Sequence, residues 1–358
     1  MSRAALVAVA LCALAACAPT RPHAHLAALA AGDRAYSAGR FLEAAEAYDR
    51  AAAETTRERD RVEATFRSAA ARQRGGDVAG AMERYASVAS TSPRYERGPR
   101  ALYEVARMRT QSQSAEAREA GWRAMGELLR AHPTTGPGRR AMFHLLRRRD
   151  EADPTGAEGV AFIEGLLAEE AVASAMRDTL LAERARRLER MGRAAEAEAA
   201  WDEMLRAVPY PQNAHWDDGH VALARLRRAR GDARGAVAAL DRMLAVREPS
   251  YSSGTYNAPR FGAGAMLRAE ILRDDLRDAR AAAEAFHFVY ADFPTSLLRD
   301  DALWNEGLVR ERAGDPGACD VWERLAREFP CHRFGRRAAT RAAACGRSVP
   351  APPRRCDR

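Results

Sequence analysis

The 358-residue sequence has no lysine, few aromatic residues and no basic stripe with interleaved aromatics. All 57 basic residues are arginine, and the 49 acidic residues are spread among them at helical spacing, which is typical of a solvated, salt-bridged surface. The net charge of +8 and the pI near 9.5 would suit nucleic-acid binding. Without a basic and aromatic stripe we predict no nucleic-acid partner. Weak attraction to anionic lipid or polysaccharide stays open as an alternative.

Alternating β-branched runs bounded by turns are also missing, so we expect no strands. Ala, Leu, Arg and Glu, which are strong helix formers, are abundant, and the predicted fold is all-α. The first apolar segment, 4–16, has only thirteen residues. A membrane-spanning helix needs about 20 apolar residues, so this segment has the size of the apolar part of a signal peptide.

The letters LAAC at residues 14–17 resemble the lipobox of bacterial lipoprotein precursors. The resemblance implies a signal peptide at 1–16, acylation of Cys17 (palmitate), and a short tether at 17–24. Because Ala18 rather than Asp follows the cysteine, it also implies an outer-membrane lipoprotein that faces the periplasm. Two alternatives stay open: ordinary secretion with a cut after Ala18, since residues 16–18 read A-C-A, or an uncleaved segment.

A pattern of a small residue, a large apolar residue four positions on and a proline eight further on recurs along the chain. Two degenerate copies begin at Ala44 and Ala236, and the double gap between Gly121 and Ala197 predicts a hidden unit at 139–170. The small residue lets two antiparallel helices approach closely, the large residue fills the space beside it, and the proline ends the helix. The five full copies are Ala81/Tyr85/Pro93, Gly121/Met125/Pro133, Ala197/Trp201/Pro209, Ala282/Phe286/Pro294 and Ala318/Trp322/Pro330.

Turn signals stand ahead of the small residue in most copies. The glycine of each signal ends one helix, and an aspartate after it is suited to capping the next. Asp315-Pro316 reads as a cap followed by proline at the first helical position. The signals are Gly39-Arg40, Gly76-Asp77, Gly192-Arg193, Gly231-Asp232 and Gly314-Asp315.

Over about residues 25–330 the pattern resembles the tetratricopeptide repeat (TPR), whose second helix carries A-x3-F and a final proline. The resemblance implies a TPR-like α-solenoid, a right-handed superhelix of antiparallel helix pairs with about eight units and a capping helix. The first helices keep the family pattern poorly; only Gly32, Ala69, Ala185 and Ala224 fill its small position. A general helical bundle with coincidental prolines is the alternative.

The long, loose units are similar to TPR proteins of the Gram-negative envelope, such as the lipoprotein of the β-barrel assembly machine and the partner of the Tol–Pal system. The letters FPTS at 293–296, followed by DDALW at 300–304, carry this resemblance. It implies a scaffold that binds proteins in the envelope, and its sharper form is a role in outer-membrane protein assembly.

Four cysteines remain after Cys12 and Cys17 are set aside, and an even number in an exported chain suggests two disulfides. We expect a last repeat helix near 316–328 and an antiparallel capping helix near 334–345, which places Cys319 opposite Cys345.

Fourteen helical residues separate Cys331 from Cys345 by about 21 Å, which is too far for a disulfide. The second predicted pair is therefore Cys331–Cys356, which would clip the Pro-rich end of segment 331–358 onto the turn. A zinc or redox site is the alternative, but the spacings match no compact zinc motif and there is no C-x-x-C.

Catalytic motifs are missing: the sequence has no phosphate loop, nucleophile elbow or H-E-x-x-H. His215 and His220 flank Trp216, Asp217 and Asp218, and a His–Asp cluster is one possible metal site. A polar first turn of a helix is the simpler explanation. We predict no enzyme activity, no metal and no cofactor.

An insert at 249–262 widens the spacing between two units. Together with the preceding Glu248 it reads EPSYSSGTYNAPRFG. Tyr and Arg on an adaptable loop are favoured at binding surfaces, whereas loop aromatics that only pack on neighbouring helices are the alternative. An extended peptide held by Arg pairs and stacked aromatics would fit. The predicted partner-binding residues are Tyr251, Tyr256, Arg260, Phe261, Arg225, Arg228 and Arg310.

We expect a lipid-anchored periplasmic scaffold that holds other envelope proteins. The alternative is an envelope factor tied to cell-wall glycan or polysaccharide export, related to Tol–Pal or glycan transport. A third hypothesis is an enzyme with an unrecognised site at 215–220.

Overall fold

The computed structural model of the protein describes residues 21–91, 96–246 and 260–350. Within these ranges it contains seventeen helices and no strand, which confirms the all-α prediction. In chain order the helices make eight consecutive pairs and a final single helix. The chain divides into two compact units: unit 1 is Met1–Pro154 with Glu169–Met176, and unit 2 is Thr155–Ala168 with Arg177–Arg358.

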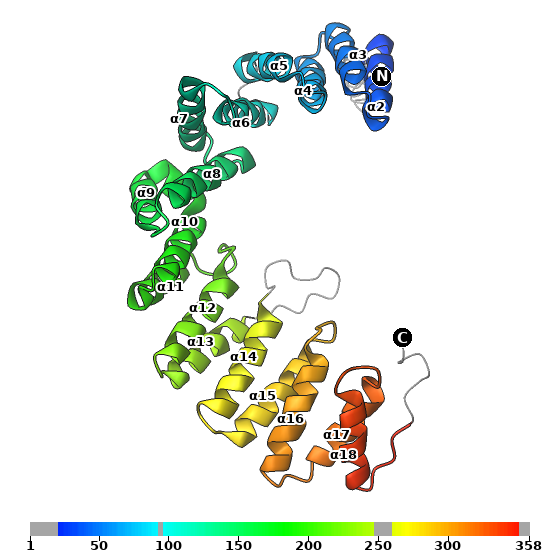
Figure 1. The fold of residues 1–358 in the computed structure, drawn as a ribbon, viewed down its shortest axis with the longest axis vertical. Coiled ribbons are helices and arrows are strands. Elements are labelled where there is room, and N and C mark those ends of the chain that lie inside the picture. Colours follow the sequence, from blue (N-terminus) through cyan, green and yellow to red (C-terminus); the bar gives the residue numbers. More distant parts are fainter. Residues whose placement is uncertain (1–20, 92–95, 247–259, 351–358) are drawn as a thin grey trace, which may run out of the picture. The chain divides into compact units, whose positions relative to one another are not determined.

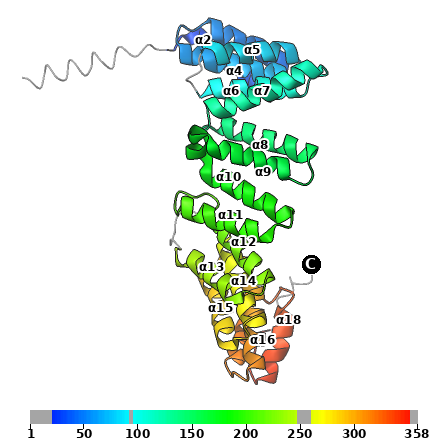
Figure 2. The ribbon, with the colours of Figure 1, turned by 90° about the vertical axis from the view of Figure 1, so that its left-hand side faces the viewer.

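Unit 1 is a run of helices in which each packs on the next one along the chain, as Figures 1 and 2 show. The complete helices of unit 1 are α2 (His23–Ser37), α3 (Phe41–Ala53), α4 (Glu58–Arg74), α5 (Val78–Thr91), α6 (Arg97–Thr110), α7 (Ala115–Ala131) and α8 (Gly136–Ala152). In addition, α4 contacts α6, and α6 contacts α8.

Unit 2 follows the same rule from α11 to α18. Helix α10 (Glu170–Arg190) is interrupted at Met176, whose φ of −151° and ψ of 33° are not helical, and only its part from Arg177 belongs to unit 2. The other helices are α9 (Ala157–Ala168), α11 (Ala194–Ala207), α12 (Trp216–Ala229), α13 (Ala233–Ala245), α14 (Phe261–Asp274), α15 (Ala279–Asp292), α16 (Arg299–Arg312), α17 (Ala318–Glu328) and α18 (Gly335–Ala344).

The repeating residues build the core. Wherever the pattern occurs, it lies on the second helix of a pair, and both its small and its large residue are buried. The range 139–170 predicted to hold a hidden unit contains most of α8 and all of α9, which belong to different compact units, so the hidden unit stays a prediction. The buried large residues are Tyr48, Tyr85, Met125, Trp201, Leu240, Phe286 and Trp322.

Glycine allows the closest approach inside two of the pairs. A Cβ at Gly32 would lie 2.5 Å from the ring of Tyr48, and one at Gly307 would lie 2.4 Å from the ring of Trp322. Real Cβ atoms do not come this close, so the backbone of the first helix rests directly on the aromatic residue of the second.

The predicted stop signals act where expected. Helices α7, α11, α15 and α17 each end two residues before the proline of their copy, because the residue before proline is driven out of helical conformation. The five turn glycines have φ between 70° and 88°, which favours glycine. Helix α13 begins after Asp232, whose carboxylate accepts the Gly235 N–H at 2.8 Å.

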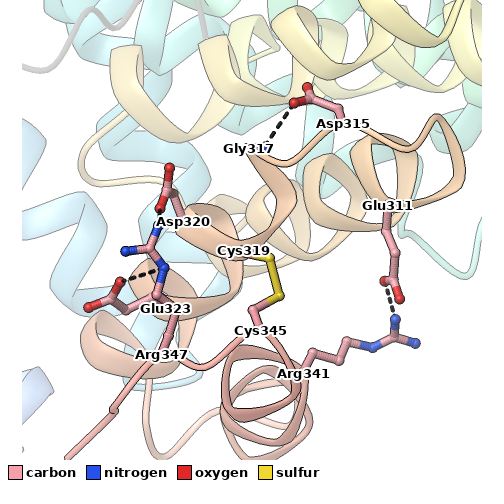
Figure 3. The surroundings of a disulfide bond; sticks show 9 residues. All are labelled: Glu311, Asp315, Gly317, Cys319, Asp320, Glu323, Arg341, Cys345 and Arg347. Carbon is pink, nitrogen blue, oxygen red and sulfur yellow. Dashed lines mark hydrogen bonds and ion pairs between the residues drawn. A yellow bond between two sulfur atoms is a disulfide. The ribbon is translucent and has the colours of Figure 1, made fainter.

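One start differs from the prediction. Helix α17 begins at Ala318, so Pro316 is not its first helical residue. The Asp315 carboxylate accepts the Gly317 N–H at 2.8 Å, which closes a short turn before the helix starts (Figure 3). Among the described residues, no helix is both long enough and apolar enough to cross a bilayer.

We predict that Gly307→Ala lowers the free energy of unfolding by about 1–3 kcal/mol, because the added methyl group overpacks against Trp322. Gly165→Ala is the matched control: no atom lies within 4 Å of its added Cβ, so better helix propensity should raise stability by up to about 1 kcal/mol. Urea unfolding followed by circular dichroism measures both. Equal effects of the two substitutions would contradict the close-packing account.

Candidate functional site

First-turn aspartates in unit 2 tie one repeat to the next. Asp217, at the start of α12, accepts the backbone N–H of Arg260 at 3.0 Å, and Arg260 directly precedes α14. Asp178, just after the interruption in α10, accepts the Ala214 N–H at 3.0 Å. Each carboxylate thus holds the segment that leads into the following first helix.

The third tie uses a side chain instead of the backbone. The buried carboxylate of Asp300 in α16 lies 2.8 Å from the His332 ring nitrogen Nδ1. The next residues repeat the arrangement, because Asp301 pairs with Arg333 as Asp218 pairs with Arg260 at 2.8 Å. Adjacent aspartates here serve the neighbouring repeat, and they do not form an acid–base pair.

The two aspartates of α12 differ in electrostatic environment. The His215 ring and the Arg260 guanidinium hold the pKa of Asp218 well below its usual range, despite partial burial. Arg186 adds an ion pair to Asp218 at 3.0 Å. Burial raises the pKa of Asp217, which is only 2% exposed. This cluster is a rigid junction whose charges are largely matched within it.

The predicted binding insert falls mostly outside the described residues, and so do Tyr251 and Tyr256. Arg260 is exposed but already bound to Asp218. Phe261 is buried at 4% exposure, and its ring lies 6.3 Å from that of Trp216. The packing alternative therefore describes Phe261, whose ring belongs to the core of unit 2 and not to a free surface.

The three first-helix arginines predicted to bind a partner also differ from one another. Arg225 is exposed and has no ion-pair partner among the described residues. Arg228 pairs with Asp275 at 2.8 Å, and Arg310 pairs with Glu306 at 2.9 Å and with a second acid. Arg228 thus links α12 to the end of α14, Arg310 makes local pairs only, and Arg225 alone of the three presents an unmatched charge among the described residues. Their role in binding stays a prediction.

The surroundings of His220 indicate a structural role for this residue. His220 is buried and packs edge-on against Trp216 with 4.5 Å between ring centres. Burial lowers the pKa of His220 to about 4, and Arg242 contributes. Its Nδ1 has no hydrogen-bond partner in the part of the chain that the structure describes. No group of three or more potential ligands suited to a metal ion occurs in ranges 21–91, 96–246 and 260–350.

A second polar surface lies in unit 1 and was not predicted. It joins α6 and α8 through Tyr103, whose hydroxyl lies 2.8 Å from Nε2 of His144. Arg140 stacks on the Tyr103 ring at 4.7 Å. The sequence signal for this surface is the set of arginines three, four or seven residues apart on α6 and α8, which share one face of each helix.

The predicted disulfide Cys319–Cys345 is present and joins α17 to the end of α18, with a Cα–Cα separation of 5.8 Å (Figure 3). Ion pairs surround it: Arg341 with Glu311 and Arg347 with Asp320. The pair Cys331–Cys356 involves a residue outside the described ranges and stays a prediction, as does lipid attachment at Cys17.

Comparison with known proteins gives structural matches only. No family model and no curated protein matches the chain. A tetratricopeptide repeat protein from Parabacteroides merdae is 14% identical, covering 79% of this chain and 98% of its own, with a TM-score of 0.34. A thermophilic TPR protein of Thermus thermophilus is 18% identical over 74% of this chain and 100% of its own, with a TM-score of 0.25. The TPR2AB domain of yeast Sti1, solved with an Hsp90 peptide, is 14% identical over 85% and 98%, with a TM-score of 0.28.

These TM-scores are low, so the fold assignment rests on the helix pairs themselves. Buried small and large residues at fixed spacing, left-handed turn glycines and terminal prolines define a TPR-like α-solenoid.

Acid should weaken unit 2 through His220. Its pKa is lower in the folded state than the ordinary value of about 6.5, so the unfolded chain binds the proton first. The contribution of neutral His220 to the free energy of unfolding is fully present above pH 6.5 and is lost as the pH falls toward 4. Between pH 7.5 and 4.5 we expect the wild type to lose about 2–3 kcal/mol more than His220→Leu, measured by urea unfolding with tryptophan fluorescence. Parallel pH profiles would contradict this origin.

Removing the disulfide should loosen the last helix. In Cys345→Ser we expect backbone amides of α18 to exchange with deuterium at least tenfold faster, because a cross-link of this loop length contributes about 2–4 kcal/mol. Amides of α2 should exchange as in the wild type, and Cys319→Ser should match Cys345→Ser. Unchanged exchange in α18 would show that its ion pairs and aromatic contacts suffice.

Proposed function

We propose that this chain is a lipid-anchored scaffold that binds other proteins in the bacterial envelope. The observation that carries the binding role is the repeated first helix, which brings polar side chains of successive repeats next to each other in each unit, as at Arg186, Asp218 and Arg260. Stacked repeats of this kind offer extended binding surfaces. The solved complex of the Sti1 TPR2AB domain with an Hsp90 peptide is an example of such binding in another protein.

The anchor is proposed from the LAAC letters at 14–17. The first described helix begins at His23, so at most about 25 Å of extended chain separates Cys17 from the folded body. One acyl chain binds a membrane weakly, whereas two or more hold it stably. We place the protein in the outer membrane, facing the periplasm, with a role in outer-membrane protein assembly.

The anchor is tested by Cys17→Ser, with Cys12→Ser as the matched control in the same segment. We expect Cys17→Ser to lose incorporation of labelled palmitate and to leave the membrane fraction, whereas Cys12→Ser keeps both. An N-terminus at residue 19 in the mature wild-type protein would contradict the proposal and favour ordinary secretion.

The scaffold is tested by crosslinking in living cells and mass spectrometry of the proteins attached to a C-terminally tagged chain. We expect subunits of the β-barrel assembly machine. Recovery of Tol–Pal or glycan-synthesis components would instead favour the cell-wall alternative. If nothing is enriched over a tagged control lipoprotein, the scaffold proposal fails.

A further inference from the structure

Two helices of unit 1 present matching rows of polar side chains. Arg100, Tyr103 and Arg107 lie at i, i+3 and i+7 and so share a face of α6. Residues 140, 144 and 147 share a face of α8 in the same way. The hydrogen bond between Tyr103 and His144 joins the rows at 2.8 Å. We call this surface the α6–α8 basic face; its residues are Arg100, Tyr103, Arg107, Arg140, His144 and Arg147.

Most of the net charge of the chain is concentrated on these two helices. Residues 97–110 and 136–152 contain nine arginines and three acids, an excess of six positive charges, against +8 for the whole chain. Helix α8 alone carries five of the arginines. The charge on this part of unit 1 is therefore far from the balanced pattern found elsewhere in the sequence.

Few acids neutralise the face. Glu104 pairs with Arg107 at 2.9 Å, and Glu151 pairs with Arg147 at 3.6 Å, where both side chains are well exposed. Arg100 and Arg140 have no acidic partner among the described residues. Instead, Arg100 stacks on Phe66 at 5.3 Å and Arg140 on Tyr103 at 4.7 Å, which fixes their positions while leaving their charge unmatched.

The His144 imidazole lies between the two rows, and the charges around it change its pKa. Burial first, and then the charges of Arg147, Arg107 and Arg140, lower the pKa of His144. The Nδ1 atom of His144 accepts a hydrogen bond from the Arg147 guanidinium at 3.2 Å. Three guanidinium groups from two helices thus lie close enough to His144 to affect its pKa, and the contact between α6 and α8 is positively charged.

An exposed apolar side chain lies beside the row on α8: Phe143, one residue before His144, is 41% exposed. Phe143 lies four residues from Arg139 and from Arg147 on α8, so these three side chains are neighbours on the helix surface. Cations beside an exposed aromatic ring are a favourable combination for binding a peptide.

We propose that the α6–α8 basic face binds an acidic segment of a partner protein, which pairs its carboxylates with Arg100, Arg140 and Arg147 and packs an apolar side chain on Phe143. This inference rests on the proposed scaffold function and names the chemistry of the partner. A short segment suits the face better than a continuous anionic membrane, because Glu104 and Glu151 lie among the arginines and would be repelled by a uniform negative surface.

The test begins with random twelve-residue peptides displayed on phage and selected on the full chain. We expect the enriched peptides to be rich in Asp and Glu around an aromatic residue or Leu. Fluorescence anisotropy of one labelled winner then gives its affinity. Arg140→Glu with Arg147→Glu should weaken binding at least tenfold, and Phe143→Ser about threefold.

Arg206→Glu with Arg234→Glu is the matched control. It makes the same charge change at exposed arginines of unit 2 that have no acidic partner among the described residues, and it should change the affinity less than twofold. Circular dichroism melting curves confirm that all variants fold. Tyr103→Phe adds a variant of the contact between α6 and α8 that keeps every charge and should weaken binding only slightly.

Three results would overturn the inference. Selected peptides without acidic residues would do so, and so would equal losses in the two double variants. The third result has two parts: no peptide binds, and vesicles with 30% phosphatidylglycerol bind the wild type but not Arg140→Glu/Arg147→Glu. That result would identify a lipid surface as the ligand. If crosslinks to envelope proteins persist in this variant, the scaffold stands and only its binding face lies elsewhere.

Discussion

Burial of a large side chain of the second helix against a small residue of the first is the constraint on which the repeats depend, and the contact is closest where the small residue is glycine. Trp322 lies against the backbone of α16 at Gly307, and Tyr48 lies against α2 at Gly32. Any side chain on the first helix at these points would separate the pair. The spacing of small residue, large residue and proline follows from this contact, because the helix must present its large residue inward and then stop. The arginine-rich surface is free to vary as long as this contact is kept.

Arginine serves two purposes in the described residues. In unit 2, Arg228 and Arg260 hold neighbouring segments together by pairing with acids. On α6 and α8, arginines stack on aromatic rings instead and keep an unmatched charge. Because guanidinium groups are planar, they can cover an aromatic ring and still present N–H donors outward. The same residue type therefore supports the fold in one region and offers a binding surface in another.

Local rules made much of the fold predictable. The turn glycines, the terminal prolines, the buried repeat residues and the Cys319–Cys345 pair all follow from spacing along the chain. The ties between repeats were not predictable, because Asp217 and Arg260 are 43 residues apart in the sequence and the spacing of the repeats is widened between them. For the same reason the sequence suggested Phe261 as a binding residue, although the start of α14 buries its ring. The basic face on α6 and α8 was missed because its two arginine-rich segments are about 40 residues apart in the sequence, and only the contact between the helices, seen in the Tyr103–His144 pair, brings them together.

The disulfide between α17 and α18 also bears on how the chain matures and comes apart. Because Cys319 and Cys345 are 26 residues apart in the sequence, the bond can close only once the helices that carry both cysteines have been synthesised, and its formation needs an oxidising environment. Repeats open locally where they have fewest packed neighbours. With α17 and α18 cross-linked, local opening of unit 2 is biased away from its last two helices, so the order in which its repeats unravel has a direction.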